Sequence, residues 1–296
     1  MNVLKGKVNL SLIQLAGGLP DKLTNLQNAK KLIDKCILQY PKTQVVVLPE
    51  CFNSPYSVDK FREYSEIISL DEPKSISVHS MSQWAREHKI LLIGGSIPEL
   101  DPKDNKVYNT SIIFSPEGEI LGKHRKMHLF DVDIPNGITF KESITLTGGS
   151  DVTILDTKLP STPATQFKFG VGICYDMRFP ELAMISARKG ACCMIYPSAF
   201  NTVTGPMHWH MLARARSIDN EIYTILCSPA RSKDPSVYQA YGHSLVCSPK
   251  GEILVEAGES EEILNCELDG EVIDTIRMSI PINFQRRFDV YKNVAE

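Results

Sequence analysis

The sequence predicts an α/β protein built as a four-layer α-β-β-α sandwich. Apolar runs of strand length recur along the chain, helical patterns lie between several of them, and one strand-turn-strand pattern occurs twice. With 296 residues, 43% of them hydrophobic, the chain can bury a large layered core. We see no linker between independently folding parts, so we expect a single domain over residues 1–296.

Eight apolar runs have the length and composition of buried strands, and three segments have helical spacing. The expected strands cover residues 8–15, 45–48, 90–93, 111–114, 167–173, 193–196, 222–226 and 244–247. The expected helices cover 23–37, after Asp21, then 78–87 and 209–218. Strand and helix therefore alternate along most of the chain, which is typical of α/β folds.

The repeated pattern indicates two equivalent half-structures. Residues 108–121 read YNTSIIFSPEGEIL and residues 241–254 read YGHSLVCSPKGEIL, with eight of fourteen positions identical. Each copy is a strand, a Ser-Pro-x-Gly turn and a second strand, so we expect one antiparallel hairpin in each of two sheets. Two sheets packed face to face with helices outside them give the four layers. Residues 131–163 are rich in Gly, Pro and Thr, and we expect a long ordered loop there.

Composition excludes several classes of function. The net charge is −3 and the basic residues form no stripe, so nucleic acid is not an expected partner. No run of 18 apolar residues occurs, and the first residues do not resemble a signal peptide, so we expect no membrane partner and a cytoplasmic location, with a mitochondrial fraction left open. The eight cysteines are scattered among apolar runs, which indicates reduced core thiols rather than a disulfide framework.

Cys174 is a candidate nucleophile because of its position. It ends an apolar run and is followed by YDMRFP and a helix-like stretch, so it lies where a strand turns sharply into a helix. A thiol on such a turn projects from the sheet end, and the backbone amides that follow can stabilise an oxyanion. A buried structural cysteine would also fit this pattern.

Glu50 and Lys126 are the candidate partners. Glu50 follows the buried run 45–49, which places a carboxylate at the carboxyl edge of a sheet, and partial burial there would raise its pKa and suit a general base. Lys126 lies in the basic run KHRKMH at 123–128. A solvated strand-end acid and a solvated basic face are the plainer interpretations.

Other catalytic and metal-binding templates lack their signatures. His124 and His128 are four residues apart but lack the glutamate of a His-Glu-x-x-His motif, and no C-x-x-C pair occurs, so we assign no metal ligands and no cofactor. Gly-x-Ser-x-Gly, P-loop and dinucleotide-binding patterns are missing as well. A Cys-His dyad with His243 as the base stays open.

Three motifs taken in order resemble the signatures of the nitrilase, or carbon-nitrogen hydrolase, superfamily. They are LPE ending at Glu50, HRK ending at Lys126 and GICYDMRFPE around Cys174, and the resemblance covers essentially the whole chain. It implies the four-layer nitrilase-type sandwich and a Glu-Lys-Cys triad that forms a thioester. Glu142 matches a second glutamate of the family, which would orient Lys126 or the leaving group, although the stretch around 159–165 is longer than usual.

Within the superfamily, the segments 51–56, 130–135 and 200–209 are most similar to omega-amidases. The resemblance implies hydrolysis of the terminal amide of 2-oxoglutaramate or 2-oxosuccinamate to a 2-oxo dicarboxylate and ammonia. Such a substrate carries a distal carboxylate and needs a cation and donors opposite the nucleophile. The expected substrate-binding residues are Arg178 as a bidentate cation, Tyr56 and Thr204 as hydroxyl donors, Phe200 as an apolar wall, and Tyr175, whose backbone amide joins Lys126 at the oxyanion.

Two alternatives stay open. An amidase for deaminated glutathione, or another small-amide or nitrile hydrolase, would use the same triad, and an inactive interaction module could retain the fold. A homodimer is the expectation from the resemblance.

Overall fold

Two β-sheets organise the computed structural model of the chain, which describes residues 3–16, 18–133, 139–160 and 165–296. The first sheet has the strand order β15-β1-β2-β3-β5-β4, with β6 also paired to β5. Its strands β1, β2 and β3 are parallel, and the other neighbours pair antiparallel. The bounds are β1 (Lys7–Gln14), β2 (Val45–Val47), β3 (Leu91–Ile93), β4 (Ile97–Asp101), β5 (Lys106–Phe114), β6 (Ile120–Arg125) and β15 (Glu262–Asp269).

The second sheet has the order β14-β13-β12-β11-β10-β9. Its central strands β10, β11 and β12 are parallel, so both sheets combine a parallel centre with antiparallel edges. The bounds are β9 (Thr153–Leu159), β10 (Thr165–Val171), β11 (Cys193–Pro197), β12 (Tyr223–Cys227), β13 (Leu245–Cys247) and β14 (Ile253–Glu256). A separate two-stranded ribbon joins β7 (Asp131–Asp133) to β8 (Thr139–Lys141).

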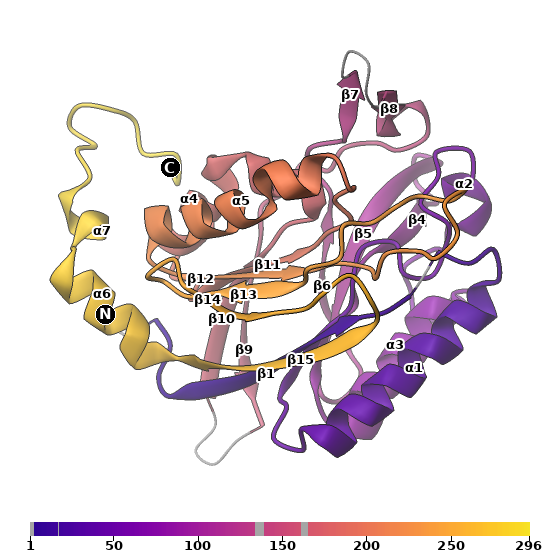
Figure 1. Cartoon of the computed structure of the whole chain (residues 1–296), viewed down its shortest axis with the longest axis horizontal. Coiled ribbons are helices and arrows are strands. Elements are labelled where there is room, and N and C mark those ends of the chain that lie inside the picture. The colour runs from indigo at the N-terminus through magenta and orange to yellow at the C-terminus, as the bar shows by residue number, and fades with distance from the viewer. Residues whose placement is uncertain (1–2, 17, 134–138, 161–164) are drawn as a thin grey trace.

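Helices cover the outer face of each sheet (Figure 1). Helices α1 (Lys22–Gln39) and α3 (Ile76–His88) lie on the first sheet, and α4 (Pro180–Arg188) and α5 (Thr204–Asn220) lie on the second. The side chain of Asp21 caps α1 by accepting a hydrogen bond from the amide of Leu23. The remaining helices are α2 (Phe61–Tyr64), α6 (Gly270–Ser279) and α7 (Ile282–Gln285).

Three apolar clusters separate these layers. The cluster between the sheets joins Leu10 and Val45 of the first sheet to Phe169 and Ile225 of the second. A second cluster lies between the first sheet and α1 and α3, and a third between the second sheet and α4 and α5. The predicted α-β-β-α sandwich is therefore confirmed.

The two related sequence segments occupy equivalent places in the two sheets. Residues 108–121 lie in the β5–β6 hairpin of the first sheet, and residues 241–254 lie in the β13–β14 hairpin of the second. Both hairpins carry a register shift, between Ile113 and Phe114 in one and between Val246 and Cys247 in the other. The sequence similarity thus reflects the same structural unit used once in each sheet.

The expectation of a loop throughout residues 131–163 was wrong. This segment contains the β7–β8 ribbon, a 3-10 helix η1 (Glu142–Ile144) and β9, which is an edge strand of the second sheet. Most residues of β9 are half-buried or exposed, so the strand lacks the apolar run that identifies a buried strand. The longer stretch noted around 159–165 falls partly on 161–164, outside the described residues.

None of the helices in the described residues combines the length and the apolar character that a membrane span requires.

Candidate active site

Glu50 lies just beyond the carboxyl end of β2, where the sequence placed it. The Leu48 amide still bonds the Ile93 carbonyl, and the chain then turns inward, so the Glu50 side chain is buried. Its carboxylate accepts hydrogen bonds from Asn109 Nδ2 at 2.8 Å, Lys126 Nζ at 3.1 Å and the Ala199 amide at 2.7 Å. These three donors, from remote parts of the chain, fix the direction of the carboxylate.

Cys174 follows β10 on a sharp turn. Its φ is +48°, a left-handed backbone conformation that non-glycine residues rarely adopt, and it begins the 3-10 helix η2 (Cys174–Arg178) that precedes α4. The element directly after the cysteine is thus a 3-10 turn, with α4 starting at Pro180. The Cys174 side chain is 5% exposed, and its thiol interacts with the Glu50 carboxylate.

Lys126 and Glu142 complete a buried cluster of charged groups. Lys126 directly follows β6, and its ammonium lies 3.1 Å from Glu50 Oε1 and 2.9 Å from Glu142 Oε1. Glu142 also accepts hydrogen bonds from Tyr56 Oη at 2.6 Å and from the Phe130 amide at 2.7 Å. The structure therefore brings all four expected catalytic residues together, with Lys126 between the two carboxylates.

Burial shifts the pKa values of this cluster. Desolvation raises the pKa of Glu50, opposed by the Lys126 charge. Desolvation and the charge of Glu50 raise the pKa of the Cys174 thiol well above its usual value. Burial alone would lower the pKa of Lys126, but Glu142 and Glu50 outweigh it and hold that pKa well above the ordinary lysine value. The resting cluster therefore has a neutral thiol, a charged lysine and a carboxylate that can accept a proton.

Asp176 is a buried residue that sequence reasoning missed. Its carboxylate lies 3.0 Å from His124 Nε2 and 2.8 Å from His128 Nδ1, and it accepts hydrogen bonds from the amides of His128 and Ile173. Burial opposes its ionisation, but these donors hold the pKa of Asp176 well below its usual value. Asp176 thus ties the segment that carries Lys126 to the turn that carries Cys174. The position of Asp176 two residues after Cys174 was the sequence signal that could have identified it as part of the site.

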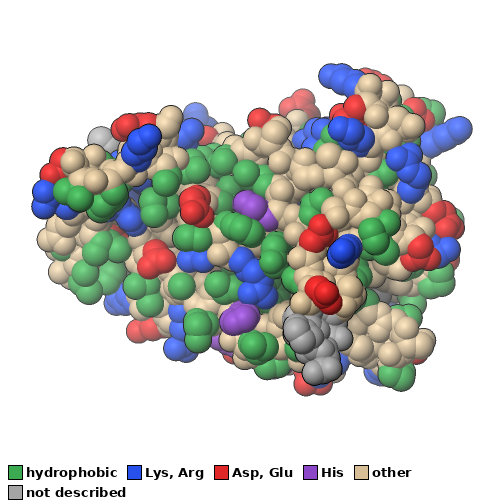
Figure 2. All heavy atoms as spheres, turned by 90° about the horizontal axis from the view of Figure 1, so that it is seen from above, with side chains coloured by type: hydrophobic (Ala, Val, Ile, Leu, Met, Phe, Trp, Pro, Cys, Tyr) green, Lys and Arg blue, Asp and Glu red, His purple; other side chains and the backbone are tan. Residues whose placement is uncertain are grey.

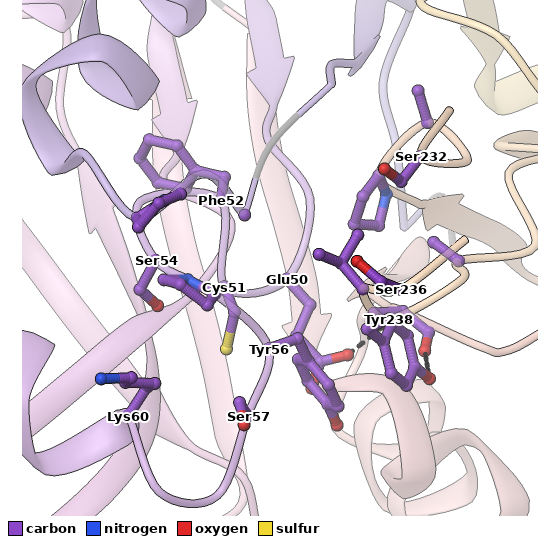
Figure 3. Close-up of a pocket in the computed structure, with 18 of the residues that line it drawn as sticks. Glu50, Cys51, Phe52, Ser54, Tyr56, Ser57, Lys60, Ser232, Ser236 and Tyr238 are labelled. Atoms are coloured by element: carbon purple, nitrogen blue, oxygen red, sulfur yellow. Dashed lines mark hydrogen bonds between the residues drawn. The ribbon is translucent and has the colours of Figure 1, made fainter. Parts of the chain in front are cut away.

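Two adjoining cavities border this cluster of charged residues and Cys174. A small recess of about 10 Å³ borders Cys174, and its wall contains the expected substrate-binding residues Tyr175, Arg178, Phe200 and Thr204. A cavity of about 390 Å³ is lined by Glu50 and Tyr56 but does not reach Cys174 (Figure 3). The recess holds about one water molecule, whereas the larger cavity has the volume of a small-molecule site.

Tyr238 lies between the two cavities and was also missed. It lines both of them, its hydroxyl donates a hydrogen bond to the Ala199 carbonyl at 2.5 Å, and its ring lies 4.6 Å from that of Tyr56 (Figure 3). Tyr238 precedes β13 in a segment without regular secondary structure, which gives no sequence pattern from which its position could be predicted. Tyr238 is therefore part of the wall of both cavities.

Arg178 places a positive charge in the recess. Its guanidinium lies 3.0 Å from His208 Nδ1 and over the rings of Phe200 and Tyr175, at 4.9 and 5.4 Å. Across the described residues, no carboxylate lies within ion-pair distance of it, and its Nε is buried without a hydrogen-bond partner. An organic carboxylate is the complement that this cation lacks.

The other expected substrate-binding residues differ in the contacts that they already make within the protein. Thr204 lies at the start of α5, and its hydroxyl and amide contact Asn201 Oδ1 at 3.1 and 2.8 Å. Phe200 packs edge-on against Trp209 with the ring centroids 5.1 Å apart. The hydroxyl of Tyr56 already donates to Glu142, so Tyr56 supports the charged cluster from the larger cavity.

The histidine alternatives find other partners. His124 and His128 both contact the carboxylate of Asp176. They therefore do not form the helical zinc-binding pair considered from the sequence. His243 Nδ1 lies 2.9 Å from Glu256 Oε1, whereas the Cys174 thiol interacts with Glu50, so the geometry gives no support to a Cys-His dyad.

Comparison with known proteins relates this geometry to a family. Residues 9–278 match the family described as carbon-nitrogen hydrolase. The chain is 60% identical to the omega-amidase NIT3 of Saccharomyces cerevisiae, covering 99% of this chain and 97% of that protein. It is 48% identical to the omega-amidase NIT2-A of Xenopus laevis, covering 98% of each.

The crystal structure of Saccharomyces cerevisiae Nit3, a member of branch 10 of the nitrilase superfamily, aligns with a TM-score of 0.87 at 56% identity, over 97% of this chain and 98% of that one. The chain belongs to the carbon-nitrogen hydrolase family.

Proposed function

We propose that the protein is an omega-amidase, a hydrolase that cleaves the terminal amide of 2-oxo dicarboxylic acid monoamides such as 2-oxoglutaramate and 2-oxosuccinamate. The products are the 2-oxo dicarboxylate and ammonia. The observation that carries the proposal is the convergence of Cys174, Glu50 and Lys126 beside a recess that contains the unpaired cation Arg178. The names of the Saccharomyces cerevisiae and Xenopus laevis relatives support the same substrate class.

The first half of the reaction forms a thioester. Glu50 takes the proton from Cys174 Sγ, and the sulfur attacks the amide carbon. The oxyanion that develops is stabilised by the Lys126 ammonium and the Tyr175 backbone amide. Glu50 then gives its proton to the amide nitrogen, the carbon-nitrogen bond breaks, and ammonia leaves.

The second half releases the acid. Glu50, ionised again, takes a proton from a water molecule, and the oxygen of that water attacks the thioester carbon. The carbon-sulfur bond breaks, the carboxylic acid leaves, and the proton held by Glu50 returns to the thiolate of Cys174. The raised pKa of Glu50 suits both directions of transfer, because a carboxyl group of ordinary pKa gives up its proton too readily to hold it between steps. Glu142 keeps Lys126 charged and aimed at the oxyanion.

Recognition of the distal carboxylate falls to Arg178. It lies four residues beyond the nucleophile and shares the recess with Thr204 and Phe200. A guanidinium can bind a carboxylate through two parallel hydrogen bonds, and Thr204 provides a hydroxyl beside it. The recess at Cys174 is smaller than the substrate, so its wall must open for binding, and movement of Tyr238, which borders both cavities, would join the recess to the larger one.

The test is ammonia release from a panel of amides. The purified chain is assayed with 2-oxoglutaramate, 2-oxosuccinamate, glutamine and deaminated glutathione, and we expect the highest kcat/KM with the 2-oxo monoamides. Cys174→Ala should lower kcat by at least about 10⁴-fold while the circular dichroism spectrum is unchanged. A preference for deaminated glutathione would contradict the substrate assignment, and near-normal turnover by Cys174→Ala would exclude the nucleophile.

We also propose that the protein is a homodimer through the outer face of α5. The residues Met207, Met211 and Ile218 form an exposed apolar stripe on this helix, and Leu254 of β14 is exposed as well. Figure 2 looks onto the side on which α4 and α5 lie and shows apolar side chains spread over this face. Exposed apolar side chains grouped on one face are typical of an interface.

A further inference from the structure

Three side chains outside the catalytic cluster converge on one oxygen atom. His210 lies on α5, His243 in the segment before β13, and Glu256 at the end of β14. His210 Nε2 lies 2.8 Å and His243 Nδ1 2.9 Å from the same Glu256 Oε1. One ligand atom from each residue lies within 4.8 Å of the others, and no other such group of three His, Cys, Asp or Glu occurs in the ranges that the structure describes.

The surrounding structure holds the three side chains in place. His243 has φ +57°, its carbonyl accepts a hydrogen bond from Trp209 Nε1 at 2.7 Å, and its ring stacks on Tyr241 with centroids 4.3 Å apart. Glu256 is fixed by pairing with Leu245 in the β13–β14 hairpin.

We propose that His210, His243 and Glu256 form a binding site for a borderline divalent cation, with Zn²⁺ the best match. Two imidazole nitrogens and one carboxylate oxygen are the donor set that zinc prefers. Bonds of about 2.0–2.1 Å place the ligands of a tetrahedral zinc ion about 3.3 Å apart, so the observed spacing needs only small side-chain rotations. The side chains are 24–35% exposed, which leaves the remaining coordination position to water.

The site differs from the catalytic cluster in its chemistry and position. Its ligands are two imidazoles and a carboxylate from α5, the segment before β13 and β14, so a bound ion would fasten α5 to the edge of the second sheet. Sequence reasoning assigned no metal ligands, because the three residues are far apart in the chain and no short motif contains them.

The experiment measures Zn²⁺ binding by the full-length chain after treatment with a chelator. Equilibrium dialysis gives stoichiometry and affinity for the wild type, His210→Ala and Glu256→Gln. His79→Ala is the matched control, because His79 lies on α3 and contacts only the Glu72 carbonyl among the hydrogen bonds found for its ring. We expect one Zn²⁺ per chain in the wild type and control, and at least about tenfold weaker binding in the two ligand variants.

Two further readouts separate this site from binding at a cysteine and from loss of fold. Co²⁺ substitution should give a visible spectrum without the intense near-ultraviolet band of a cobalt thiolate. The increase in Tm caused by Zn²⁺ should be present in the control and lost in Glu256→Gln, whose metal-free Tm establishes that it is folded. Failure of the wild type to bind Zn²⁺, or equal affinity in His210→Ala and the wild type, would overturn the proposal.

Discussion

At the residue scale, the state of the Cys174 proton decides how the site works. Burial and the charge of Glu50 raise the pKa of the thiol, so sulfur is not a preformed thiolate. In the proposed mechanism, reaction depends on transfer of this proton to Glu50, whose own pKa is raised by desolvation. In that mechanism the thiol donates one proton and the carboxylate accepts it, and the positive charge of Lys126 stabilises both transition states.

This coupling predicts the acid side of the pH profile. Glu50 acts as a base only when ionised, and its pKa is raised above the ordinary value of 4.5. The kcat/KM for the 2-oxo monoamide should therefore fall with decreasing pH through a midpoint above 4.5. The measurement is kcat/KM against pH, with circular dichroism at each pH as the control for unfolding. A profile that stays flat down to the ordinary carboxyl pKa would contradict the role of Glu50.

Arg178→Ala should discriminate between substrates. Loss of a charge-assisted hydrogen bond costs about 1.5–3 kcal/mol, so kcat/KM should fall about 10- to 150-fold for a 2-oxo monoamide. A simple amide of similar length without a carboxylate should be affected little. The matched control is Arg188→Ala, because Arg188 lies on α4 with its guanidinium over the Phe288 ring, away from the recess. Equal losses on both substrates would mean that Arg178 supports the fold of the recess instead.

At the element scale, the site depends on how β6 and the turn after β10 are fastened together. Asp176 accepts hydrogen bonds from both segments, so one buried carboxylate links the segment that carries Lys126 to the turn that carries Cys174. Asp176 does not line the recess, and we regard it as a positioning residue.

Asp176→Asn removes this carboxylate with little change in shape. We expect a loss of about 3 kcal/mol in the free energy of unfolding, because an amide cannot accept all these hydrogen bonds and leaves buried donors unpaired. The Asp176 pKa is lower in the folded protein than the ordinary 3.8, so its stabilising effect is complete above 3.8 and is lost as the pH falls through the lowered pKa.

The measurement is urea unfolding of the two proteins at pH 7 and in acid. The difference between wild type and Asp176→Asn should be largest at pH 7 and shrink in acid, and kcat should fall at pH 7 because Lys126 is displaced from Cys174. The control is Asp71→Asn at an exposed position. A difference in stability that does not depend on pH would indicate a packing effect rather than loss of the charge.

Elements with a clear hydrophobic pattern were predictable from the sequence, and those without one were not. The buried strands β2 and β11 and the helices α1, α3 and α5 lie where the pattern placed them. The edge strands β9 and β15 were missed, because their side chains alternate between buried and exposed environments and carry polar residues. The paired hairpins were predictable because a Ser-Pro-x-Gly turn has its own sequence signature.

At the scale of the whole molecule, the layers explain why the two halves of the chain both contribute to the site. Glu50 and Lys126 follow strands of the first sheet, and Cys174 follows a strand of the second. The apolar cluster between the sheets holds their edges at a fixed distance. The site is therefore a product of sheet packing, and it cannot be assembled by either half alone.

The proposed dimer can be tested by a substitution on the outer face of α5, the helix that covers the second sheet. Met211→Glu places a charge in the middle of the exposed apolar stripe on α5, and burial of this charge in an interface would be costly. We expect the wild type to be a dimer by light scattering and Met211→Glu to be shifted toward monomer. The control is Leu38→Glu, because Leu38 is exposed on α1, which covers the other sheet. A monomeric wild type, or an unchanged mass for Met211→Glu, would exclude this interface.

The sequence by itself determined the layered fold, the sharp turn at Cys174 and the identity of Glu50, Lys126, Cys174 and Glu142 as candidate catalytic residues. These features depend on local patterns or on short motifs, which the order of residues contains directly. Only the tertiary structure revealed the support from Asp176, the place of Tyr238, the unpaired state of Arg178 and the meeting of His210, His243 and Glu256. The physical reason is that pKa shifts, hydrogen bonds and ligand spacing depend on burial and on distances between groups that the chain itself keeps far apart.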